Sequence, residues 1–541
     1  MFLKITKSKN YYYLQIVHSY RENGTTKHKV YANLGRFDQL KDNPQLIRLG
    51  KRFLEIAGKT TSGSSDIKEL ERLAFGHVVY RKLWKKWKFP SLLRELLKKS
   101  KIRFDFVNTI FLLLIDRLLA PQSKLQSFEK QSRYVDMDKI RLHHIYRSLD
   151  VLCEAKEWIE DSLFERRRDL FNYKVNIVFY DVTTFHFESV ESDDLRDFGF
   201  SKNGKFNEVQ VVLGLLVDSL GAPIGFDLFP GNSYEGDTLA NAIEKLKKRF
   251  AIDEVIVVTD KGMSNMQNFG KIRNAGYHYI ISMRLKSLSK PLQEKILDER
   301  GYRELKHEEN ARFRYKIIKD HPQTMRDEQE RKITEKVNLV CFWSEKMARK
   351  NKADRQRMLE KAEVKLKKGG SINDKRGYRR YIETDGKKEI TGIDMDRFEK
   401  DARYDGYYVI ESSSPRLTAA QVLSEYKKLW RIENSFRVMK SGLWTRPVFH
   451  WTPRRIKGHF VLCFMALLLE RDLENRLSNK NLNLSPEKIK QSLNSLQMSL
   501  IRMDGSEYYL KGKVEKTASS ILRAMRIKQP PNLVSAEKFN L

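Results

Sequence analysis

Three acidic residues lie far apart in the chain, in segments that suggest a common function. Asp181 and Asp260 each follow an apolar run of the kind that forms β-strands. Glu433 lies in a third segment, Tyr426–Lys440, which is rich in basic residues. Carboxylates hold hard cations such as Mg²⁺, whereas Lys and Arg bind phosphates. The combination suggests metal-dependent chemistry on phosphodiesters.

The composition points to a polyanionic partner. The 541 residues include 103 Lys and Arg against 70 Asp and Glu, which gives a formal net charge of +33. A charge of this size favours nucleic acid as the partner, while an anionic membrane surface and simple solubility remain alternatives. Hydrophobic residues make up 40% of the chain, which is enough for packed cores in several domains.

Cysteine usage and hydropathy indicate the compartment. Cys153, Cys341 and Cys463 are far apart and form no CxxC pair, which argues against a zinc ribbon or a disulfide framework. The first residues lack the apolar stretch of a signal peptide, and the apolar run Phe460–Leu469 is too short to span a membrane. We therefore expect a cytoplasmic, nucleoid-associated protein.

The first two acids are expected at the ends of strands. Residues 176–187 and 254–260 predict strands, and a helix and a further strand follow the second of them. This alternation indicates a mixed α/β sheet, and open α/β sheets place their sites at such strand ends. An acid in this position is also often a turn or capping residue, so position alone assigns neither Asp181 nor Asp260.

The third acid is expected on a helix that covers about residues 419–439. At about 100° per residue, apolar residues from Leu429 to Met439 form one flank, which should face the core. The other side carries the polar and aromatic residues Tyr426, Trp430, Glu433, Arg437 and Lys440. Such a surface suits a bound nucleic-acid strand, although an ordinary amphipathic helix with a mixed polar face would show the same pattern.

Changes in composition divide the chain into six expected regions. The first is β-rich, with a tight turn predicted at Asn23-Gly24, and the second is helical, basic and a candidate for DNA binding. The third and fifth form one α/β core, which a charged and partly strand-rich insertion interrupts, and the last is helical. In chain order the regions are 1–60, 61–172, 173–289, 290–405, 406–470 and 471–541.

The spacing of Tyr426, Glu433 and Lys440 resembles a known signature. It is similar to that of the DDE transposases of bacterial insertion sequences, in the branch called insertion-sequence family four. The arginine of that signature would fall at position 429, where this chain has Leu429. Further motifs occur in the order of that family, namely Pro121–Lys124, Gln210–Leu215, Phe229–Asn232, Asp237–Leu239, Arg446-Pro447 and His450.

The resemblance implies an RNase H-like catalytic domain of the α/β class. Asp181, Asp260 and Glu433 would then be catalytic and would hold two Mg²⁺ ions, for which Mn²⁺ could substitute. The implied reaction is cleavage of double-stranded DNA at terminal inverted repeats and strand transfer to target DNA, by a homodimer without a membrane partner. The residues implied in DNA binding are Tyr426, Trp430, Arg437 and Lys440.

Two other interpretations remain open. The chain could be a catalytically inactive DNA-binding protein derived from a transposase, or a metal-dependent nuclease on the same fold. The presence of all three acids favours the enzyme over the inactive protein. Strand joining in addition to cutting would exclude both alternatives, and short inverted repeats in the DNA flanking the coding region would support the first interpretation.

Overall fold

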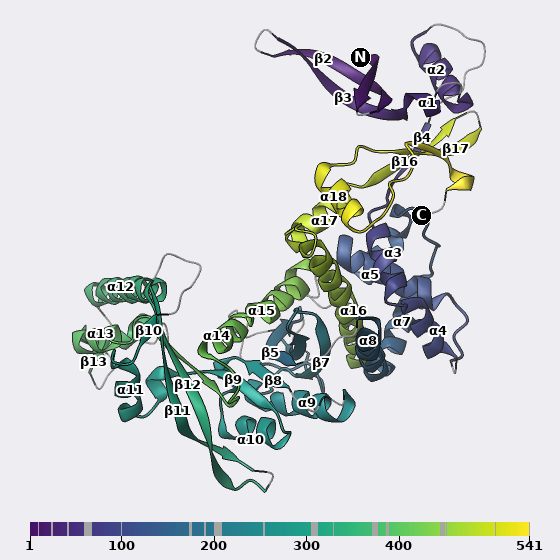
Figure 1. The fold of residues 1–541 in the computed structure, drawn as a ribbon. Coiled ribbons are helices and arrows are strands. Elements are labelled where there is room, and N and C mark those ends of the chain that lie inside the picture. The colour runs from purple at the N-terminus through teal and green to yellow at the C-terminus, as the bar shows by residue number, and fades with distance from the viewer. Residues whose placement is uncertain are drawn as a thin grey trace. The chain divides into compact units, whose positions relative to one another are not determined.

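The computed structural model falls into two compact units, which we describe separately (Figure 1). The first unit comprises Met1–Asn172, Phe185–Gln210 and Ser435–Leu541, and the second comprises Tyr173–Thr184 and Val211–Asn434. The structure describes all residues except 9, 23–24, 41–42, 59–67, 99, 172–175, 189–190, 200–207, 251, 253–254, 305–311, 328, 370–376, 386–388, 444–449, 451, 504 and 540–541. The predicted turn at Asn23-Gly24 and the motif Arg446-Pro447 therefore lie outside the described residues.

A nine-stranded sheet forms the centre of the second unit. Its strands are arranged in the order β10-β11-β12-β15-β9-β8-β5-β6-β7. Their bounds in this order are Arg303–Glu304, Phe313–Arg326, Lys332–Ser344, Tyr407–Ser412, His278–Met283, Ile256–Thr259, Ile177–His186, Gln210–Asp218 and Pro223–Pro230. Every residue of β6 is buried, because its near-continuous apolar sequence suits a strand that is covered on both faces.

The arrangement of strands β5 to β9 confirms the predicted RNase H-like α/β fold. β5 pairs in parallel with β8, and β8 pairs in parallel with β9. On the other side of β5, β6 and β7 form an antiparallel hairpin. The helical segments that follow β7 and β8 are α9 (Leu239–Glu244) and α10 (Met266–Asn274).

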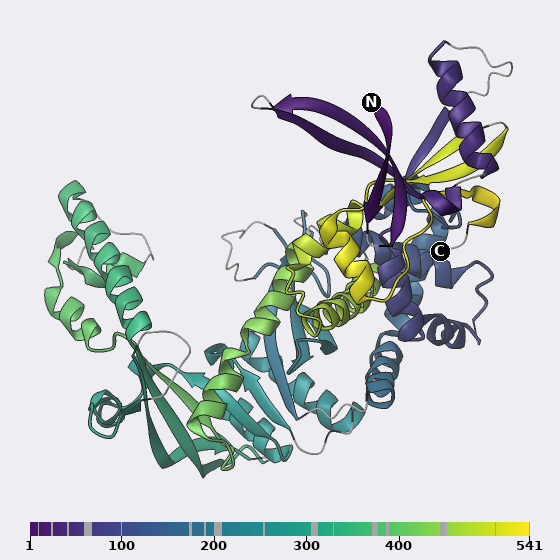
Figure 2. The same cartoon turned by 45° about the horizontal axis from the view of Figure 1, so that its top comes forward.

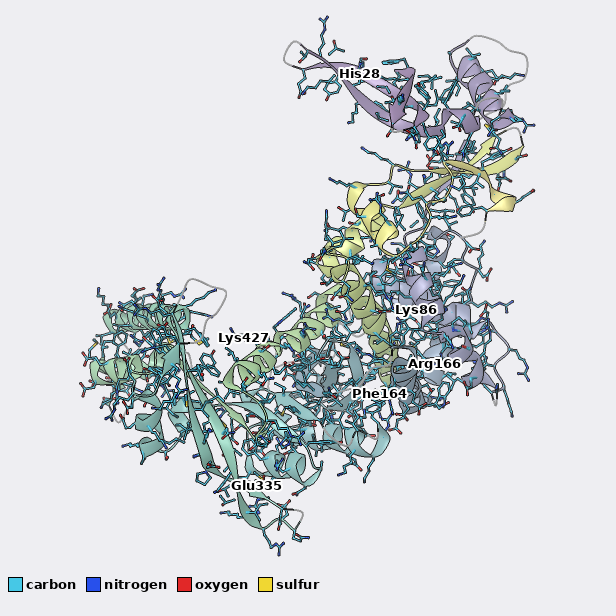
Figure 3. All side chains as sticks on the ribbon, viewed as in Figure 1. His28, Lys86, Phe164, Arg166, Glu335 and Lys427 are labelled. Carbon is cyan, nitrogen blue, oxygen red and sulfur yellow. The ribbon has the colours of Figure 1, made fainter. Side chains whose placement is uncertain are left out.

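The charged segment 290–405 contributes to this sheet and also forms a smaller body. Its strands β10 to β12 extend the sheet beyond β15. An ion pair of 2.7 Å joins Arg273 of α10 to Glu335 of β12, and Glu335 is labelled in Figure 3. The smaller body consists of α12 (Glu345–Lys368), the two-stranded sheet β13-β14 (Ile382–Thr384 and Ile390–Ile393) and α13 (Met395–Ala402) (Figure 2).

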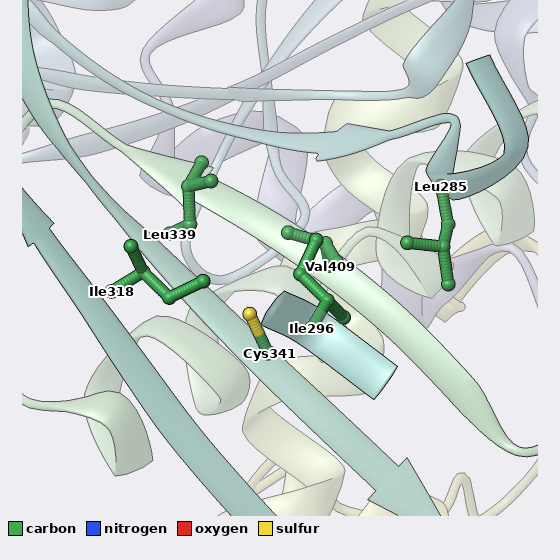
Figure 4. Packing of buried hydrophobic residues seen from close by; sticks show 6 residues of the cluster. All are labelled: Leu285, Ile296, Ile318, Leu339, Cys341 and Val409. Carbon is green, nitrogen blue, oxygen red and sulfur yellow. The ribbon is translucent and has the colours of Figure 1, made fainter. Parts of the chain in front are cut away.

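A buried cluster attaches helix α11 (Lys290–Leu297) to the extended part of the sheet. It joins side chains from the helix, from β11, β12 and β15 and from the turn after β9, and Figure 4 shows them close together. The members are Leu285, Ile296, Ile318, Leu339, Cys341 and Val409. Cys341 is a free thiol, as are the other two cysteines, so no disulfide contributes to the fold.

Strand β15 carries a buried acid whose ionisation should weaken the second unit. The hydroxyl of Tyr279 donates a hydrogen bond of 2.5 Å to Oε1 of Glu411, while Oε2 has no hydrogen-bond partner within the described residues. Burial raises the pKa of Glu411 from 4.5 to about 7, although the hydrogen bond opposes the rise. The folded chain therefore keeps a proton that the unfolded chain loses, and stability falls as the pH rises from about 4.5 to about 7.

Replacing this carboxyl with an amide should remove that pH dependence. We expect the unfolding free energy of Glu411→Gln, measured relative to that of the unchanged chain, to rise by about 3 kcal/mol as the pH increases from 4 to 8. Denaturant unfolding at a series of pH values measures the difference. Parallel pH profiles for the two proteins would contradict a raised pKa at Glu411.

The first unit begins with a three-stranded antiparallel sheet in the order β1-β2-β3, with bounds Phe2–Ser8, Tyr11–Glu22 and Thr25–Arg36. The short helix α1 (Phe37–Leu40) and helix α2 (Pro44–Ile56) follow. Helix α2 begins at a Pro, and the side chain of Asn43 caps it by accepting a hydrogen bond of 2.9 Å from the backbone of Gln45.

A group of helices forms the core of the first unit. Their bounds are Val78–Lys86 (α3), Phe89–Leu97 (α4), Phe106–Leu119 (α5), Lys124–Glu129 (α6), Leu142–Glu154 (α7), Lys156–Phe171 (α8) and Pro453–Ser478 (α16). The predicted core segment Phe460–Leu469 is buried in α16, which packs against α7 and α5. Gly458 allows this contact, because a Cβ at that position would lie 1.9 Å from the carbonyl oxygen of Leu149. In the described part of the chain, no helix is both long and apolar enough to cross a membrane.

Two parts of the first unit differ from the sequence expectation. Lys68–Ala74, expected to begin the helical region, is strand β4, and the C-terminal region expected to be helical also contains strands β16 (Gln497–Met503), β17 (Ser506–Lys511) and β18 (Leu533–Ser535). Together they form a sheet in the order β18-β17-β16-β4, beside helices α17 (Pro486–Asn494) and α18 (Lys516–Ala524). Because β4 pairs with a strand more than 400 residues away, its local sequence does not reveal the partner.

Candidate active site

The first two acids lie side by side on neighbouring strands. The last paired residues of β5 and β8 are Tyr180 and Thr259, and Asp181 and Asp260 follow them directly. Parallel strands lie about 4.8 Å apart, and successive side chains point to opposite faces. Asp181 and Asp260 therefore share one face of the sheet. Asp260 is exposed, and the half-buried Asp181 accepts a hydrogen bond of 2.8 Å from the backbone N–H of Val182 through Oδ1.

The same row continues onto the next strand. Thr259 of β8 pairs with Ile281 of β9, so Ser282 follows in register with Asp260. Ser282 lies close enough to Tyr426, on helix α14 (Ala419–Lys427), to lower the pKa of that phenol. The ends of three parallel strands and helix α14 thus meet at one place in the second unit.

Tyr426 connects the third acid to this row electrostatically. Burial raises the pKa of Tyr426, and the negative charges of Asp260 and Glu433 raise it further, while the hydrogen bond with Ser282 opposes the rise. The charges of both carboxylates therefore influence the pKa of the same phenol. Glu433 itself is exposed, in the first turn of α15 (Trp430–Arg437).

The three acids do not form a ready three-ligand group. Within the described residues, no three side chains of the Asp, Glu, His or Cys type are close enough together to hold one metal ion. Asp181 and Asp260 form a pair on the sheet, and Glu433 stands apart on its helix.

The single helix expected over 419–439 is wrong, because the structure divides it. Helix α14 ends at Lys427, and α15 begins at Trp430 after a turn in which the N–H of Leu429 bonds to the carbonyl of Tyr426 at 3.1 Å. A π-helical segment, η7 (Val438–Gly442), follows α15. Neither break begins at a Pro or Gly, so the sequence does not mark it. Because the helix is interrupted twice, a constant turn of 100° per residue does not describe the segment.

The apolar flank predicted for this segment is confirmed. Leu429, Ile432, Phe436 and Met439 are all buried, at 9% exposure or less. Leu429 thus packs into the core, and a buried leucine cannot supply the charge of the arginine in the transposase signature.

The candidates for DNA binding differ in their surroundings. Trp430 is 55% exposed, Arg437 is exposed and Tyr426 is half-buried. Lys440 belongs to η7, and its Nζ lies 5.4 Å from the centre of the Phe185 ring. The structure thus leaves Trp430 and Arg437 accessible to a ligand.

A further acid near the first strand was missed from the sequence. Burial raises the pKa of Tyr180, and the negative charges of Asp227, on β7, and of Asp181 add to the rise. Lys245, which is buried, neutralises Asp227 through an ion pair of 2.8 Å. The signal in the sequence was a single acid within an apolar strand, but its partner lies 18 residues away. The pairing suggests a structural role for Asp227.

Comparison with known proteins assigns the family. The family profile described as "Transposase DDE domain" matches residues 174–469, which is more than half of the chain. The chain belongs to the DDE transposases. A second profile, described as "IS1634 family transposase, N-terminal domain", matches residues 3–61 of this transposase. The resemblance to bacterial insertion-sequence transposases is thereby confirmed, and with it the assignment as an enzyme of transposition that acts on DNA.

Other comparisons of the transposase are weaker. No curated protein sequence matches it. A solved structure, the cryo-EM structure of the piggyBac transposase synaptic complex with hairpin DNA, is similar over 86% of this chain and 84% of that chain, at 8% identity and a TM-score of 0.34. A similarity this low supports no argument about the site.

Proposed function

We propose that this transposase cleaves double-stranded DNA at the terminal inverted repeats of its insertion sequence and joins the ends to target DNA, as a homodimer and with Mg²⁺. The observation that carries the proposal is the row at the strand ends, where Asp181 and Asp260 lie in register. Tyr426 extends this row to Glu433. DDE transposases act on DNA, and three carboxylates are the ligands that suit hard divalent cations.

The donor set fits divalent metal ions. All three candidates are carboxylates, two share one face of the sheet, and both Asp260 and Glu433 are exposed. When bound, two such ions would activate an attacking water or 3′-hydroxyl and stabilise the leaving oxygen. Asp181, Asp260 and Glu433 would hold them, and Glu433 would approach the pair on the sheet from α15.

The basic and aromatic residues around α15 would position the DNA. Arg437 lies one helical turn beyond Glu433 within α15 and is exposed, so its guanidinium can bind a phosphate with two hydrogen bonds. Trp430 offers a flat exposed surface for a base or sugar. Tyr426 would contribute a hydroxyl to DNA binding, and Lys440 would contribute a cation.

Two neighbouring arginines allow a matched test of this arrangement. Arg431 donates a hydrogen bond of 2.6 Å from Nη1 to the carbonyl of Ser219, and its side chain packs near Gly221. We expect Arg437→Ala to lower the rate of element-end cleavage roughly tenfold or more, because a charged contact to phosphate is lost. Arg431→Ala should instead lower thermal stability and leave cleavage by the folded protein nearly unchanged.

One cleavage assay and one unfolding curve compare these variants. Both remove a single guanidinium from the same helix, so the change in net charge is equal. Equal or reversed effects on cleavage would mean that the phosphate contact comes from another segment, such as the basic helix α12.

A strand-transfer assay distinguishes this proposal from a nuclease or an inactive DNA-binding protein. Linear duplexes that end in the terminal repeats are incubated with a target plasmid and Mg²⁺. Products in which the repeat ends are covalently joined to the plasmid support the proposal. Cleavage without joining would indicate a nuclease, and binding without cleavage would indicate an inactive protein.

A further inference from the structure

Part of the N-terminal sheet is two strands wide, and its contact with β1 is the edge-on packing of the His28 ring against Phe2 at 5.6 Å. Strand β1 pairs only with Tyr11–Val17 of β2. Beyond this point His18–Glu22 pairs with Thr25–Lys29 of β3 alone. We call these two segments the ribbon; Figures 1 and 2 show β2 and β3 extending past β1. Every described side chain of the ribbon is exposed.

The ribbon is basic and carries different side chains on its two faces. Its two segments contain three Lys and Arg, namely Arg21, Lys27 and Lys29, and one acid, Glu22, which pairs with Lys27 at 2.7 Å. Directly opposed residues share a face in an antiparallel pair. Figure 3 shows sticks on both sides of the ribbon, where His28 is labelled. One face carries His18, Tyr20, Glu22, Thr25, Lys27 and Lys29, and the other carries Ser19, Arg21, Thr26 and His28.

Such a ribbon gains little from folding by itself. An isolated two-stranded hairpin is marginally stable in water, and exposed strand edges invite unwanted pairing. The base of the ribbon is anchored, because Leu14 and Val17 are buried at 7% and 1% exposure. The exposed extension therefore contributes nothing visible to the core, which suggests that it serves a ligand.

The dimensions and the charge of the ribbon fit duplex DNA. The major groove is about 12 Å wide and admits a two-stranded β-ribbon. Strand β3 also lines a cavity of about 1120 Å³ whose lining includes Lys511 and Lys513, so further cations lie beside the base of the ribbon. A ribbon with exposed cations on both faces is suited to a groove that has phosphates along both rims.

We propose that the ribbon enters the major groove of the element-end duplex and contributes to its recognition; this inference rests on the proposed function. The face with Arg21 and His28 meets the base edges, because Arg binds guanine with two hydrogen bonds and the short Ser19 and Thr26 allow close approach. The face with Lys27 and Lys29 meets phosphates, which flexible ammonium groups bind as point charges. The helical region 61–172 is then not the only contributor to DNA binding.

The register of the sheet allows the ribbon to be removed cleanly. Val17 and Val30 are paired directly, so residues 18–29 can be replaced by Asn-Gly, which closes a tight hairpin on that pair. Two double variants test the faces separately, Arg21→Ala with His28→Ala and Lys27→Ala with Lys29→Ala. The control, Lys480→Ala with Lys488→Ala, removes two exposed cations of the first unit outside the ribbon and outside region 61–172.

Binding is measured with the full-length protein over a range of salt concentrations. The probes are a duplex with the terminal repeat from the DNA flanking the coding region and a scrambled duplex of the same length. We expect the shortened ribbon to bind the repeat roughly a hundredfold more weakly. The variant without Lys27 and Lys29 should bind both duplexes equally more weakly, with a salt slope lower by about 2. The variant without Arg21 and His28 should lose roughly tenfold of its preference for the repeat.

Two outcomes would overturn the inference. They are repeat binding by the shortened ribbon equal to that of the unchanged protein, and losses in the two double variants no larger than those in the Lys480 and Lys488 control. Unaltered thermal unfolding of the point variants shows that a loss of binding is not a loss of fold. Failure of the proposed function differs, because the unchanged protein would then bind the repeat without cleaving or joining it.

Discussion

Replacing Asp260 with Ala should abolish Mg²⁺-dependent cleavage of element ends, with a loss of roughly a thousandfold or more. The carboxylate lies in register with Asp181, and a two-ion site depends on the summed negative charge of its ligands. Asp181→Ala and Glu433→Ala should have the same effect. Cleavage of a labelled duplex that carries the terminal repeat measures the loss, and a gel-shift assay measures binding.

DNA binding should survive these substitutions, because removing a negative charge does not weaken contacts with phosphate. Glu244→Ala is a matched control, since Glu244 is an exposed acid of the second unit that pairs with Lys248 at 2.8 Å. The control should cleave at the original rate. Substantial cleavage by Asp260→Ala would remove that residue from the proposed site, and lost binding would indicate a damaged fold.

Removal of divalent metal should likewise stop cleavage while leaving DNA bound. Addition of Mg²⁺ should restore the reaction, and Mn²⁺ should substitute for it, because both accept carboxylate oxygens. Metal held by these carboxylates should stabilise the second unit, because the folded chain presents all the ligands together and the unfolded chain does not. At a metal concentration about 100 times the Kd, the expected gain is roughly 2–3 kcal/mol.

Thermal unfolding with and without Mg²⁺ provides a readout that is independent of activity. The shift should be present in the unchanged protein and absent in Asp260→Ala. Full cleavage activity in excess chelator, or an equal thermal shift in both proteins, would contradict metal binding by these acids.

Local sequence patterns predicted the catalytic sheet well. The apolar runs before Asp181 and Asp260 became strands β5 and β8, and the apolar segment Phe460–Leu469 became the buried centre of α16. Strands buried on both faces and long buried helices require apolar sequence, so the requirement is visible in the residues themselves. The buried stripe from Leu429 to Met439 was predictable for the same reason.

Patterns that depend on a distant partner were not predictable. Strand β4 pairs with β16, and its spacing of Leu70 and Leu73 resembled a helical period. The break at Lys428–Leu429 carries no Pro or Gly, so only the packing of α14 and α15 reveals it. The ribbon was expected only as two strands with a tight turn, because local sequence does not tell how far β1 extends beside β2.

The sequence by itself determined which residues of this protein could do chemistry and which family they belong to, since residue types and short-range spacing are written in the chain. The tertiary structure alone decided which of them meet. It placed Asp181 beside Asp260 through the pairing of β5 with β8, and it paired Asp227 with Lys245. It also placed Glu433 on a separate helix, where its charge and that of Asp260 both raise the pKa of Tyr426, which burial raises most. Strand register and helix breaks arise from the packing of segments that are far apart in the chain, which no local pattern contains.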